Sequence, residues 1–399
     1  AKLYGASVVL GSATPSLEAY YRAGRGEYRL FQLTKRLTGG ELPTVYTVDL
    51  RQELQEGNRS IFSRKLQELM TDRLNKGQQT ILFLNRRGYA GFVSCRSCGE
   101  VMKCPHCDVS LSEHKGGRLI CHYCGYTQPM PKLCPKCGSK YILGFKAGTQ
   151  QIEEKLKELY PGVRTLRMDA DTTRTKDSYE KILSSFANGE ADVLIGTQMI
   201  VKGHDFPKVT LVGILAADLS LNASDYRAGE RTFQLLTQAV GRAGRGVLPG
   251  EAVIQTYQPD HYAITCAAAQ DYESFYQEEI LYRELSGYPP VAHMLAVQIY
   301  GKEEENVKQL ALRLTDVVKS NMDFLSGKQK EQSNKKIQVL GPAPANISKI
   351  NDIYRYVFYV KHAEYDVLVE VKDRLEETLR QWQPRQMSIQ FDFDPVSVL

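Results

Sequence analysis

Short apolar runs alternate with amphipathic stretches through the first two thirds of the chain. The runs at 81–84, 193–196 and 209–215 consist largely of Val, Ile and Leu, which is the pattern of strands buried on both faces. Between them, apolar residues recur at helical spacing over 151–160 and 179–186. This alternation predicts an α/β domain in which helices wrap a parallel sheet.

The pattern changes beyond about residue 285. Strands are expected at 293–300, 337–340, 354–360 and 388–393, and helices at 303–320 and 364–380. Their order is β-α-β-β-α-β, which is typical of a compact split-βαβ fold. We therefore expect a second, α+β domain at the C-terminal end.

The composition, with 42% hydrophobic and 24% charged residues, is that of an ordinary globular protein. The sequence contains no apolar run of the roughly 18 residues that a membrane span requires, and its start lacks the pattern of a signal peptide. We therefore expect a cytoplasmic protein with no membrane partner. The net charge of +5 permits a polyanionic partner but is too small to indicate one.

Eight of the nine cysteines lie between Cys95 and Cys137, in four C-x-x-C pairs. A disulfide framework would be unusual in a cytosolic chain of this size, and paired cysteine knuckles typically bind zinc. The segment interrupts the α/β pattern after the strand at 81–84, so we expect a zinc module over 93–141, inserted in a surface loop. The ninth cysteine, Cys266, is expected to be a buried structural thiol.

The spacing of the pairs indicates how eight thiolates divide into two tetrahedral sites. The 13 residues between Cys107 and Cys121 suit a short hairpin that closes an inner site, so we expect nested pairing. The predicted outer site is Cys95, Cys98, Cys134 and Cys137, and the predicted inner site is Cys104, Cys107, Cys121 and Cys124. Both would be closed and structural. His106, His114 and His122 are not needed as ligands, so we expect them at the surface or beside the sites.

Two loops of the α/β part are expected to meet a phosphate. The segment GSATP at 11–15 follows an expected strand at 8–10, and GTQMIVKGHDFP at 196–207 follows the strand at 193–196. Ligands of open parallel sheets bind beyond the carboxyl ends of the strands, so we place a nucleotide or phosphate at these two loops.

Arg242 and Arg245 lie among glycines at the end of an expected helix. They could direct bidentate donors at a transferring phosphate, although taken alone they could equally be two solvated arginines. They do not stand alone: SAT at 12–14, T-x-x-x-x-K-G-x-D-x-P at 197–207 and Q-x-x-G-R-x-x-R at 238–245 resemble the third, fifth and sixth motifs of superfamily 2 helicases. NRRGYA at 85–90, followed by the cysteine block, narrows the resemblance to the bacterial primosomal replication-restart DNA helicases.

This resemblance implies a RecA-like helicase lobe and an ATP-dependent 3′ to 5′ DNA helicase that recognises stalled or branched forks and initiates primosome assembly. ATP with Mg²⁺ would join the two structural zinc ions as cofactors. The implied partners are forked and single-stranded DNA, single-stranded DNA-binding protein and other primosome and helicase-loading proteins, near the bacterial nucleoid. The implied domains are the end of lobe 1 with a linker (1–40), lobe 2 (41–284) containing the zinc module (93–141), and a C-terminal domain that binds DNA and partners (285–399).

The resemblance also implies roles for single residues around the nucleotide. Arg242 and Arg245 would contact the ATP phosphates, with Arg245 as the arginine finger. Gln238 would sense the nucleotide. Asp205 matches the acid that in related helicases meets the ribose or steadies the arginines.

A second group of residues would connect the nucleotide to DNA. Ser12 and Thr14 would link hydrolysis to lobe movement, and Thr197, Lys202 and His204 would couple the nucleotide site to a DNA phosphate. From the residues themselves, we expect Thr149 to be the N-cap of the helix at 151–160. It could offer backbone amides to a DNA phosphate or serve only as a helix cap.

The sequence departs from the family in one respect. It contains neither G-x-x-x-x-G-K-[ST] nor D-E-x-H, the segments that cradle the phosphates and hold magnesium. It also begins with Ala1, just before the third motif. We therefore expect the C-terminal part of a longer protein, inactive as an ATPase by itself.

The C-terminal domain carries no net charge beyond residue 285, so DNA binding cannot be inferred from charge there. The local features are lysines at 328, 330, 335 and 336 and the strand with Tyr354, Arg355 and Tyr356. Alternation places the two tyrosines on one face and Arg355 on the other. Such aromatics can stack bases, but they pack cores more often.

A non-catalytic function remains as the alternative. The zinc module and C-terminal domain could bind DNA and proteins while a degenerate helicase lobe holds them. The retained Arg242, Arg245, Asp205 and Lys202 favour the motor, since a scaffold has no need for neighbouring phosphate-facing groups.

Overall fold

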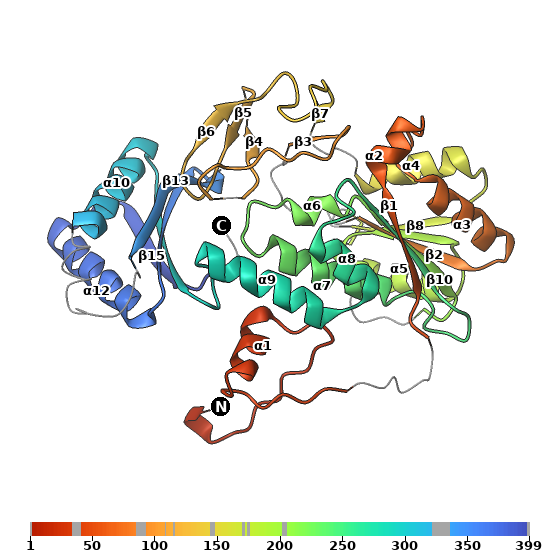
Figure 1. Ribbon diagram of the computed structural model, residues 1–399, viewed down its shortest axis with the longest axis horizontal. Helices are drawn as coiled ribbons and strands as arrows, with labels where there is room; N and C mark the ends of the chain where they lie inside the picture. The colour runs from red at the N-terminus through yellow and green to blue at the C-terminus, as the bar shows by residue number, and fades with distance from the viewer. Residues whose placement is uncertain are drawn as a thin grey trace.

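The computed structural model of the chain shows a central sheet, a small cysteine-rich unit and a C-terminal sheet domain (Figure 1). It describes residues 2–33, 41–84, 93–107, 109–114, 116–143, 148–169, 172–173, 176–201, 206–320 and 336–396. The lysines at 328, 330 and 335 and the residues Lys202, His204 and Asp205 lie outside these ranges. In the described part, no helix is both long and apolar enough to cross a membrane.

Six parallel strands form the central sheet, which confirms the predicted α/β fold class. Their order across the sheet is β1-β11-β10-β2-β9-β8, and every neighbouring pair runs parallel. The strands are β1 (Thr44–Asp49), β2 (Gln79–Leu84), β8 (Thr165–Met168), β9 (Val193–Gly196), β10 (Val209–Leu215) and β11 (Glu251–Thr256). All residues of β2, β9 and β10 are buried, as expected of strands covered on both faces.

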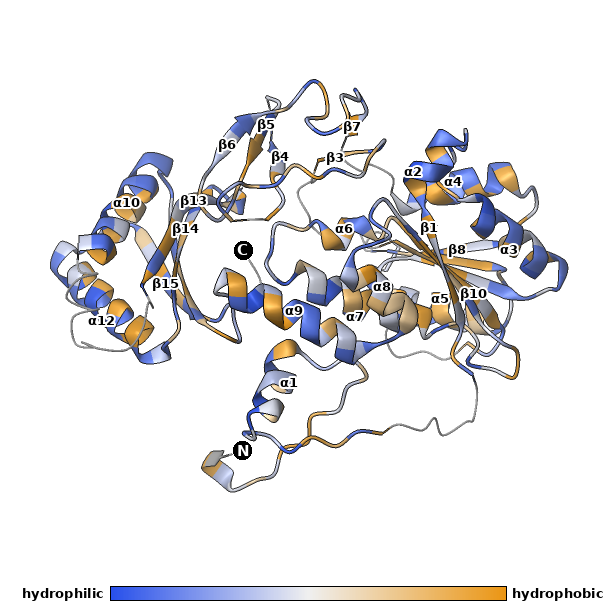
Figure 2. Cartoon of the chain, viewed as in Figure 1, coloured by the Kyte–Doolittle hydropathy of each residue, from blue (hydrophilic) through white to orange (hydrophobic). Residues whose placement is uncertain are grey.

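Helices cover both faces of this sheet. One face packs on α3 (Arg64–Asn75) and α4 (Thr149–Leu159). The other packs on α5 (Lys176–Ala187), α7 (Ala228–Val240) and α8 (Tyr262–Ala269). Figure 2 shows hydrophobic residues gathered in the strands, while the outer faces of helices such as α3 are hydrophilic. Burial of both sheet faces is the main source of stability for such a layered domain.

The N-terminal segment departs from the prediction. Residues 8–10 form no strand, and Val8, Val9 and Leu10 are exposed. The helix α1 (Leu17–Gly24) follows, capped by Ser16, and it buries Leu17 in the core shared with α7. The 3-10 helix η1 (Lys2–Tyr4) precedes these residues. GSATP therefore follows an extended segment and leads into a helix, rather than lying at the end of a strand.

The cysteine-rich module is inserted in the chain between β2 and α4. It contains two small antiparallel sheets, β3-β7 and β4-β5-β6. Their strands are β3 (Ser94–Cys95), β4 (Ser112–His114), β5 (Arg118–Ile120), β6 (Thr127–Pro129) and β7 (Ile142–Leu143). The module lies between the central sheet and the C-terminal domain (Figure 1). It is therefore a bridge between two domains, not only a surface insertion.

The C-terminal domain has the predicted β-α-β-β-α-β order. Its elements are β12 (His293–Gly301), α10 (Glu304–Ser320), β13 (Gln338–Ile350), β14 (Ile353–His362), α12 (Tyr365–Trp382) and β15 (Met387–Phe393). The sheet order is β13-β14-β12-β15, antiparallel throughout, with both helices on one face. Tyr356 is buried in the core with the helices, while Arg355 points to the opposite face beside Tyr300.

The helix α9 (Tyr272–Ser286) connects the two larger domains (Figure 1). Asp271 caps its start, and Gly287, with a φ of 61°, ends it in the left-handed conformation that glycine adopts without strain. Three short helices complete the described part: α2 (Leu50–Gln55), η2 (Gln198–Val201) and α6 (Asp218–Leu221).

Candidate functional site

Cys95, Cys98, Cys134 and Cys137 form a compact cluster at β3. Their four sulfur atoms lie within 4.8 Å of one another. The Sγ–Sγ distance is 3.6 Å for both Cys95–Cys137 and Cys98–Cys134. A disulfide would need about 2.05 Å, whereas a tetrahedron with Zn–S bonds of about 2.3 Å places its sulfurs about 3.8 Å apart. The cluster therefore has the dimensions of a structural zinc site.

The other four paired cysteines form a second cluster with the same property. The sulfurs of Cys104, Cys107, Cys121 and Cys124 also lie within 4.8 Å of one another, and Cys104 and Cys124 are 3.5 Å apart. The antiparallel hairpin β4-β5 occupies the stretch between the second and third of these cysteines. The structure thus brings together the two sets of the nested arrangement, and two four-cysteine clusters suggest two structural zinc ions.

Tight turns behind the cysteines direct backbone amides at the sulfurs. Gly99, Gly125 and Gly138 follow three of the pairs, each with a φ between 71° and 77°. The Gly99 N–H donates to the Cys95 carbonyl at 2.8 Å. The Ser97 and Cys98 amides face the Cys95 sulfur. Hydrogen bonds of this kind stabilise a thiolate, so the turns prepare the sulfurs for a cation.

The histidines of the module lie outside both clusters. His122 is fully buried, not at the surface, and it directly follows Cys121 of the second cluster. Its Nε2 lies 3.0 Å from His114 Nε2, and its Nδ1 lies 2.9 Å from the Pro344 carbonyl on β13. His122 therefore contacts the C-terminal domain.

Four tyrosines join the module to both larger domains. Tyr123 of the module stacks on Tyr359 of β14, with ring centroids 4.9 Å apart. Tyr226, which precedes α7, stacks on Tyr288 at 4.7 Å. The Tyr123 hydroxyl accepts the Tyr226 N–H at 3.3 Å. All four rings belong to one core. No sequence pattern indicated this junction, because its members are far apart along the chain.

The SAT motif at 12–14 and the Q-x-x-G-R-x-x-R motif at 238–245 meet at α7. The Gln238 side chain, in the last turn of α7, donates to the Thr14 hydroxyl at 3.5 Å. The Thr14 N–H donates to Ser12 Oγ at 3.1 Å. Thr14 is buried and Ser12 is exposed. The contact joins residues 224 positions apart, so the sequence order alone could not show it.

Arg242 and Arg245 lie just beyond the end of α7, at the amino edge of the sheet. The Gly244 N–H donates to the carbonyl of Val209, the first residue of β10. Arg245 is exposed and donates from Nε to the Gly241 carbonyl at 2.8 Å, while Arg242 is half-buried. A guanidinium carries five N–H donors in a planar fork, a geometry that can bind phosphate oxygens.

The motif at 197–207 ends beside the motif at 238–245. A Cβ on Gly246 would lie 2.4 Å from the Pro207 carbonyl oxygen, so only glycine permits this approach. Asp205, two positions before Pro207, lies outside the described residues. Segments from all three motifs therefore gather around the end of α7. This corrects the expected placement of GSATP, because the meeting point is not at the carboxyl ends of the strands.

Thr149 and Thr197 lie together at the opposite, carboxyl edge of the sheet. Thr149 is the first residue of α4 and not its N-cap, which is Gly148, so that prediction is wrong. Its hydroxyl donates to Asp169 Oδ2 at 2.6 Å, just after β8. The Thr197 N–H donates to the Met168 carbonyl at 3.3 Å. These threonines are separated from Arg242 and Arg245 by the length of the sheet strands.

A cavity of about 540 Å³ opens at the carboxyl edge, between the sheet and the cysteine-rich module. Its lining includes Arg59, Arg96 and Tyr141. Ala216 at the end of β10 also lines it, with a left-handed φ of 52°. Backbone strain at residues with a Cβ often accompanies functional sites, and basic and aromatic groups together suit a nucleic-acid strand.

Three family models match the chain. The primosomal protein N C-terminal domain matches residues 284–396, the PriA DNA helicase Cys-rich region domain matches 104–129, and the helicase conserved C-terminal domain matches 133–247. Replication restart protein PriA of Bacillus subtilis is 44% identical over 401 residues, covering 100% of this chain and 48% of the relative. The chain belongs to the PriA family.

Other PriA relatives give the same result. Replication restart protein PriA of Synechocystis is 41% identical, and the match covers 100% of this chain and 47% of the relative. Replication restart protein PriA of Haemophilus influenzae is 35% identical, and the match covers 96% of this chain and 50% of the relative. The chain spans about half the length of these curated relatives and matches the C-terminal part of PriA.

Proposed function

We propose that this chain supplies the second helicase lobe, the zinc module and the C-terminal domain of an ATP-dependent DNA helicase that acts in replication restart. The observation that carries the proposal is the gathering of three motif segments at the end of α7. Thr14 contacts Gln238, and Pro207 packs on Gly246, next to Arg245. Groups that sense and stabilise a triphosphate must act at one place, and this arrangement supplies it.

In this proposal Arg245 is the arginine finger and Arg242 a second phosphate contact. Gln238 reports the nucleotide state through Thr14 to the N-terminal segment. Arg245 is exposed and Arg242 is half-buried at the amino edge, and guanidinium groups can hold phosphate oxygens. Mg²⁺ and a phosphate-cradling loop would complete the site. Because the sequence contains no Walker loop, we expect no ATP hydrolysis by this chain alone.

We further propose that the carboxyl edge of the sheet faces DNA. Thr149 and Thr197 lie there, together with the cavity beside Arg59 and Arg96. Lys202 and His204 belong to the segment that follows Thr197 and would complete the coupling. Because the nucleotide would lie at the amino edge and DNA at the carboxyl edge, hydrolysis at the amino edge could change the affinity for DNA at the carboxyl edge.

Further properties of this function are proposed from the family resemblance. They comprise 3′ to 5′ polarity, recognition of stalled or branched forks, initiation of primosome assembly, and contacts with single-stranded DNA-binding protein and helicase loaders. Work on chromosomal DNA would place the protein in the cytoplasm, at the nucleoid. The domain limits 1–40, 41–284, 93–141 and 285–399 remain part of this proposal.

A non-catalytic scaffold is the second candidate function. The tyrosine junction favours it, because the module shares a core with both larger domains and so holds them at a set distance. In that case Arg242 and Arg245 would have no role in turnover.

The deciding experiment measures ATP hydrolysis with and without forked DNA, on this chain and on the product of the complete gene. DNA-stimulated hydrolysis only by the complete product supports the motor. Activity in neither would favour the scaffold, and activity in this chain alone would refute the need for a further lobe.

A further inference from the structure

One face of the C-terminal sheet is covered only in part. The face opposite α10 and α12 carries Ala296 and Tyr359, which are buried in the core shared with the cysteine-rich module. Toward the other end of the same face lie Tyr300 on β12 and Ser388 and Gln390 on the edge strand β15. Tyr300 is half-buried and the two β15 residues are exposed. The module therefore leaves this end of the face open.

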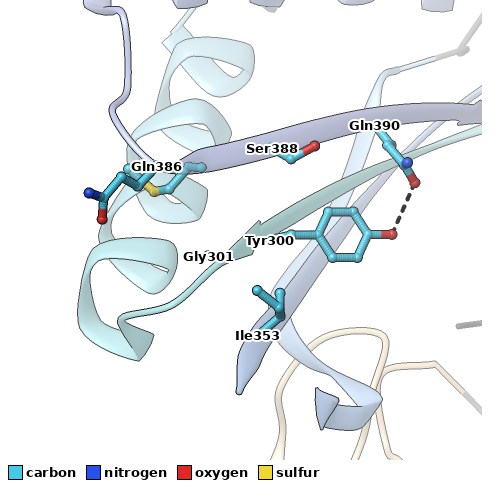
Figure 3. A pocket seen from close by; sticks show the side chains of 7 residues that line it. Tyr300, Gly301, Ile353, Gln386, Ser388 and Gln390 are labelled. Atoms are coloured by element: carbon cyan, nitrogen blue, oxygen red, sulfur yellow. Dashed lines mark hydrogen bonds between the residues drawn. The ribbon is translucent and has the colours of Figure 1, made fainter. Parts of the chain in front are cut away.

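The strand register gathers an aromatic ring, a guanidinium and amides at the open end. Tyr300 is paired with Arg355 on β14 and with Ser388 on β15, and Gln298 is paired with Gln390. The guanidinium carbon of Arg355 lies 5.7 Å from the Tyr300 ring centroid. The Tyr300 hydroxyl donates to Gln390 Oε1 at 3.2 Å (Figure 3). It also contacts the Gln298 amide oxygen.

A cavity of about 550 Å³ lies against this group, within the range of ligand-binding pockets. Its lining is Tyr300, Gly301, Ile353, Gln386, Met387, Ser388 and Gln390, with no carboxylate among them (Figure 3). Within the described part of the chain, no carboxylate lies within ion-pairing distance of Arg355. Arg385, next to Gln386, is exposed. The surroundings therefore favour an uncharged planar group joined to an anion.

We propose that this open end binds an unpaired base of single-stranded nucleic acid. The base stacks on the Tyr300 ring, the Gln390 amide and the Ser388 hydroxyl meet its polar edge, and Arg355 meets the adjoining phosphate. Amide and hydroxyl groups both donate and accept, so they suit base edges better than a peptide side chain of one charge. The site rests on the proposed function in that its ligand is the strand that the helicase would move.

The first test measures binding of a fluorescent thymidine oligonucleotide to the full 399-residue chain, without ATP. Tyr300→Leu should weaken binding about tenfold, the order of one lost stacking contact, while Tyr300→Phe keeps the ring and should bind nearly as tightly as the original chain. Arg355→Ala should reduce the slope of log affinity against log salt by about one. Tyr365→Leu and Arg374→Ala, elsewhere in the same domain, are matched controls and should leave affinity unchanged.

A second test locates the contact directly. An oligonucleotide carrying 5-iodouracil should crosslink on irradiation to a peptide containing Tyr300. Crosslinks that avoid β12 and β14, or unchanged binding by Tyr300→Leu, would overturn the proposal and leave the face to another ligand such as a peptide. Equal losses from Tyr300→Leu and Tyr365→Leu would also overturn it. Because neither assay uses ATP, the site can stand if unwinding is never observed, and can fail while unwinding is intact.

Discussion

Arg283 and Glu230 form an ion pair that is closed off from water on both sides. Arg283 Nη2 lies 3.2 Å from Glu230 Oε2, and the two side chains are 0% and 5% exposed. The same guanidinium donates to Glu279 and to the Pro289 carbonyl, and Glu230 Oε1 accepts the Leu17 N–H at 2.9 Å. One buried pair therefore joins α7, which ends at the arginines, to α1 and to the entrance of the C-terminal domain.

Arg283→Met should destabilise the fold strongly. It leaves Glu230 and Glu279 buried without their cation, although Met replaces much of the packing volume. Breaking such a pair typically costs about 3–5 kcal/mol. Urea denaturation of the chain should show this loss in the free energy of unfolding, whereas Arg374→Met on the exposed surface of α12 should change it by less than about 0.5 kcal/mol. A similar small change in both variants would contradict a structural role for the pair.

His261 should make the fold sensitive to acid. Burial lowers the pKa of His261 from 6.5 to about 4, and the Lys103 charge lowers it further. Its Nδ1 accepts the Ala263 N–H at 3.2 Å as the N-cap of α8, which requires a neutral ring. Between pH 6.5 and about 4, the unfolded chain therefore binds a proton at His261 more readily than the folded chain does. The free energy of unfolding consequently falls as the pH drops through this range.

His261→Asn tests this sign. Asparagine caps helices well and does not titrate, so the variant should lose less stability over the same pH range than the original chain. The difference between the two losses should be at most about 3 kcal/mol. Denaturation midpoints of both proteins at pH 7, 5.5 and 4.5 give the comparison. Parallel curves would show that His261 does not contribute.

Removal of metal should disturb more than the cysteine-rich module. Elemental analysis should find two zinc ions per chain, and a strong chelator should unfold residues 93–141, since their own core is small. Because Tyr123 and Tyr359 share a core, amide exchange should also accelerate in β14, but not in β2. Cys266→Ser should retain both zinc ions. Full metal removal without any change in circular dichroism would refute the structural role.

The parts of the fold that the sequence predicted are those set by local patterns. The apolar runs of β2, β9 and β10 are buried on both faces wherever they pair, so their composition was enough. Residues 8–10 have the same composition but remain exposed, because a strand needs a neighbour to complete its hydrogen bonds. Thr149 is a good capping residue, yet its hydroxyl is taken by Asp169, and Gly148 caps the helix instead.

The candidate site shows the same division. Cysteine spacing alone predicted the two clusters, since knuckle geometry is local. The contact of Gln238 with Thr14 and the pairing of Arg283 with Glu230 join distant segments, so only the fold could reveal them. The motif order also implied that the residues expected to contact phosphate act together. It did not imply that they lie at the amino edge of the sheet.

Arg245→Ala should abolish most ATP turnover of the complete gene product while leaving the fold intact. Arginine fingers accelerate phosphoryl transfer about 10³-fold or more, so turnover should fall by about that factor. The Arg245 side chain is exposed and its Nε donates to the nearby Gly241 carbonyl, so a substitution at this surface position should cost little stability. Arg245→Lys keeps the charge without the planar fork and should recover only part of the rate. Steady-state hydrolysis with forked DNA measures both variants against Arg374→Ala, and equal rates in all three would assign Arg245 to the surface and favour the scaffold.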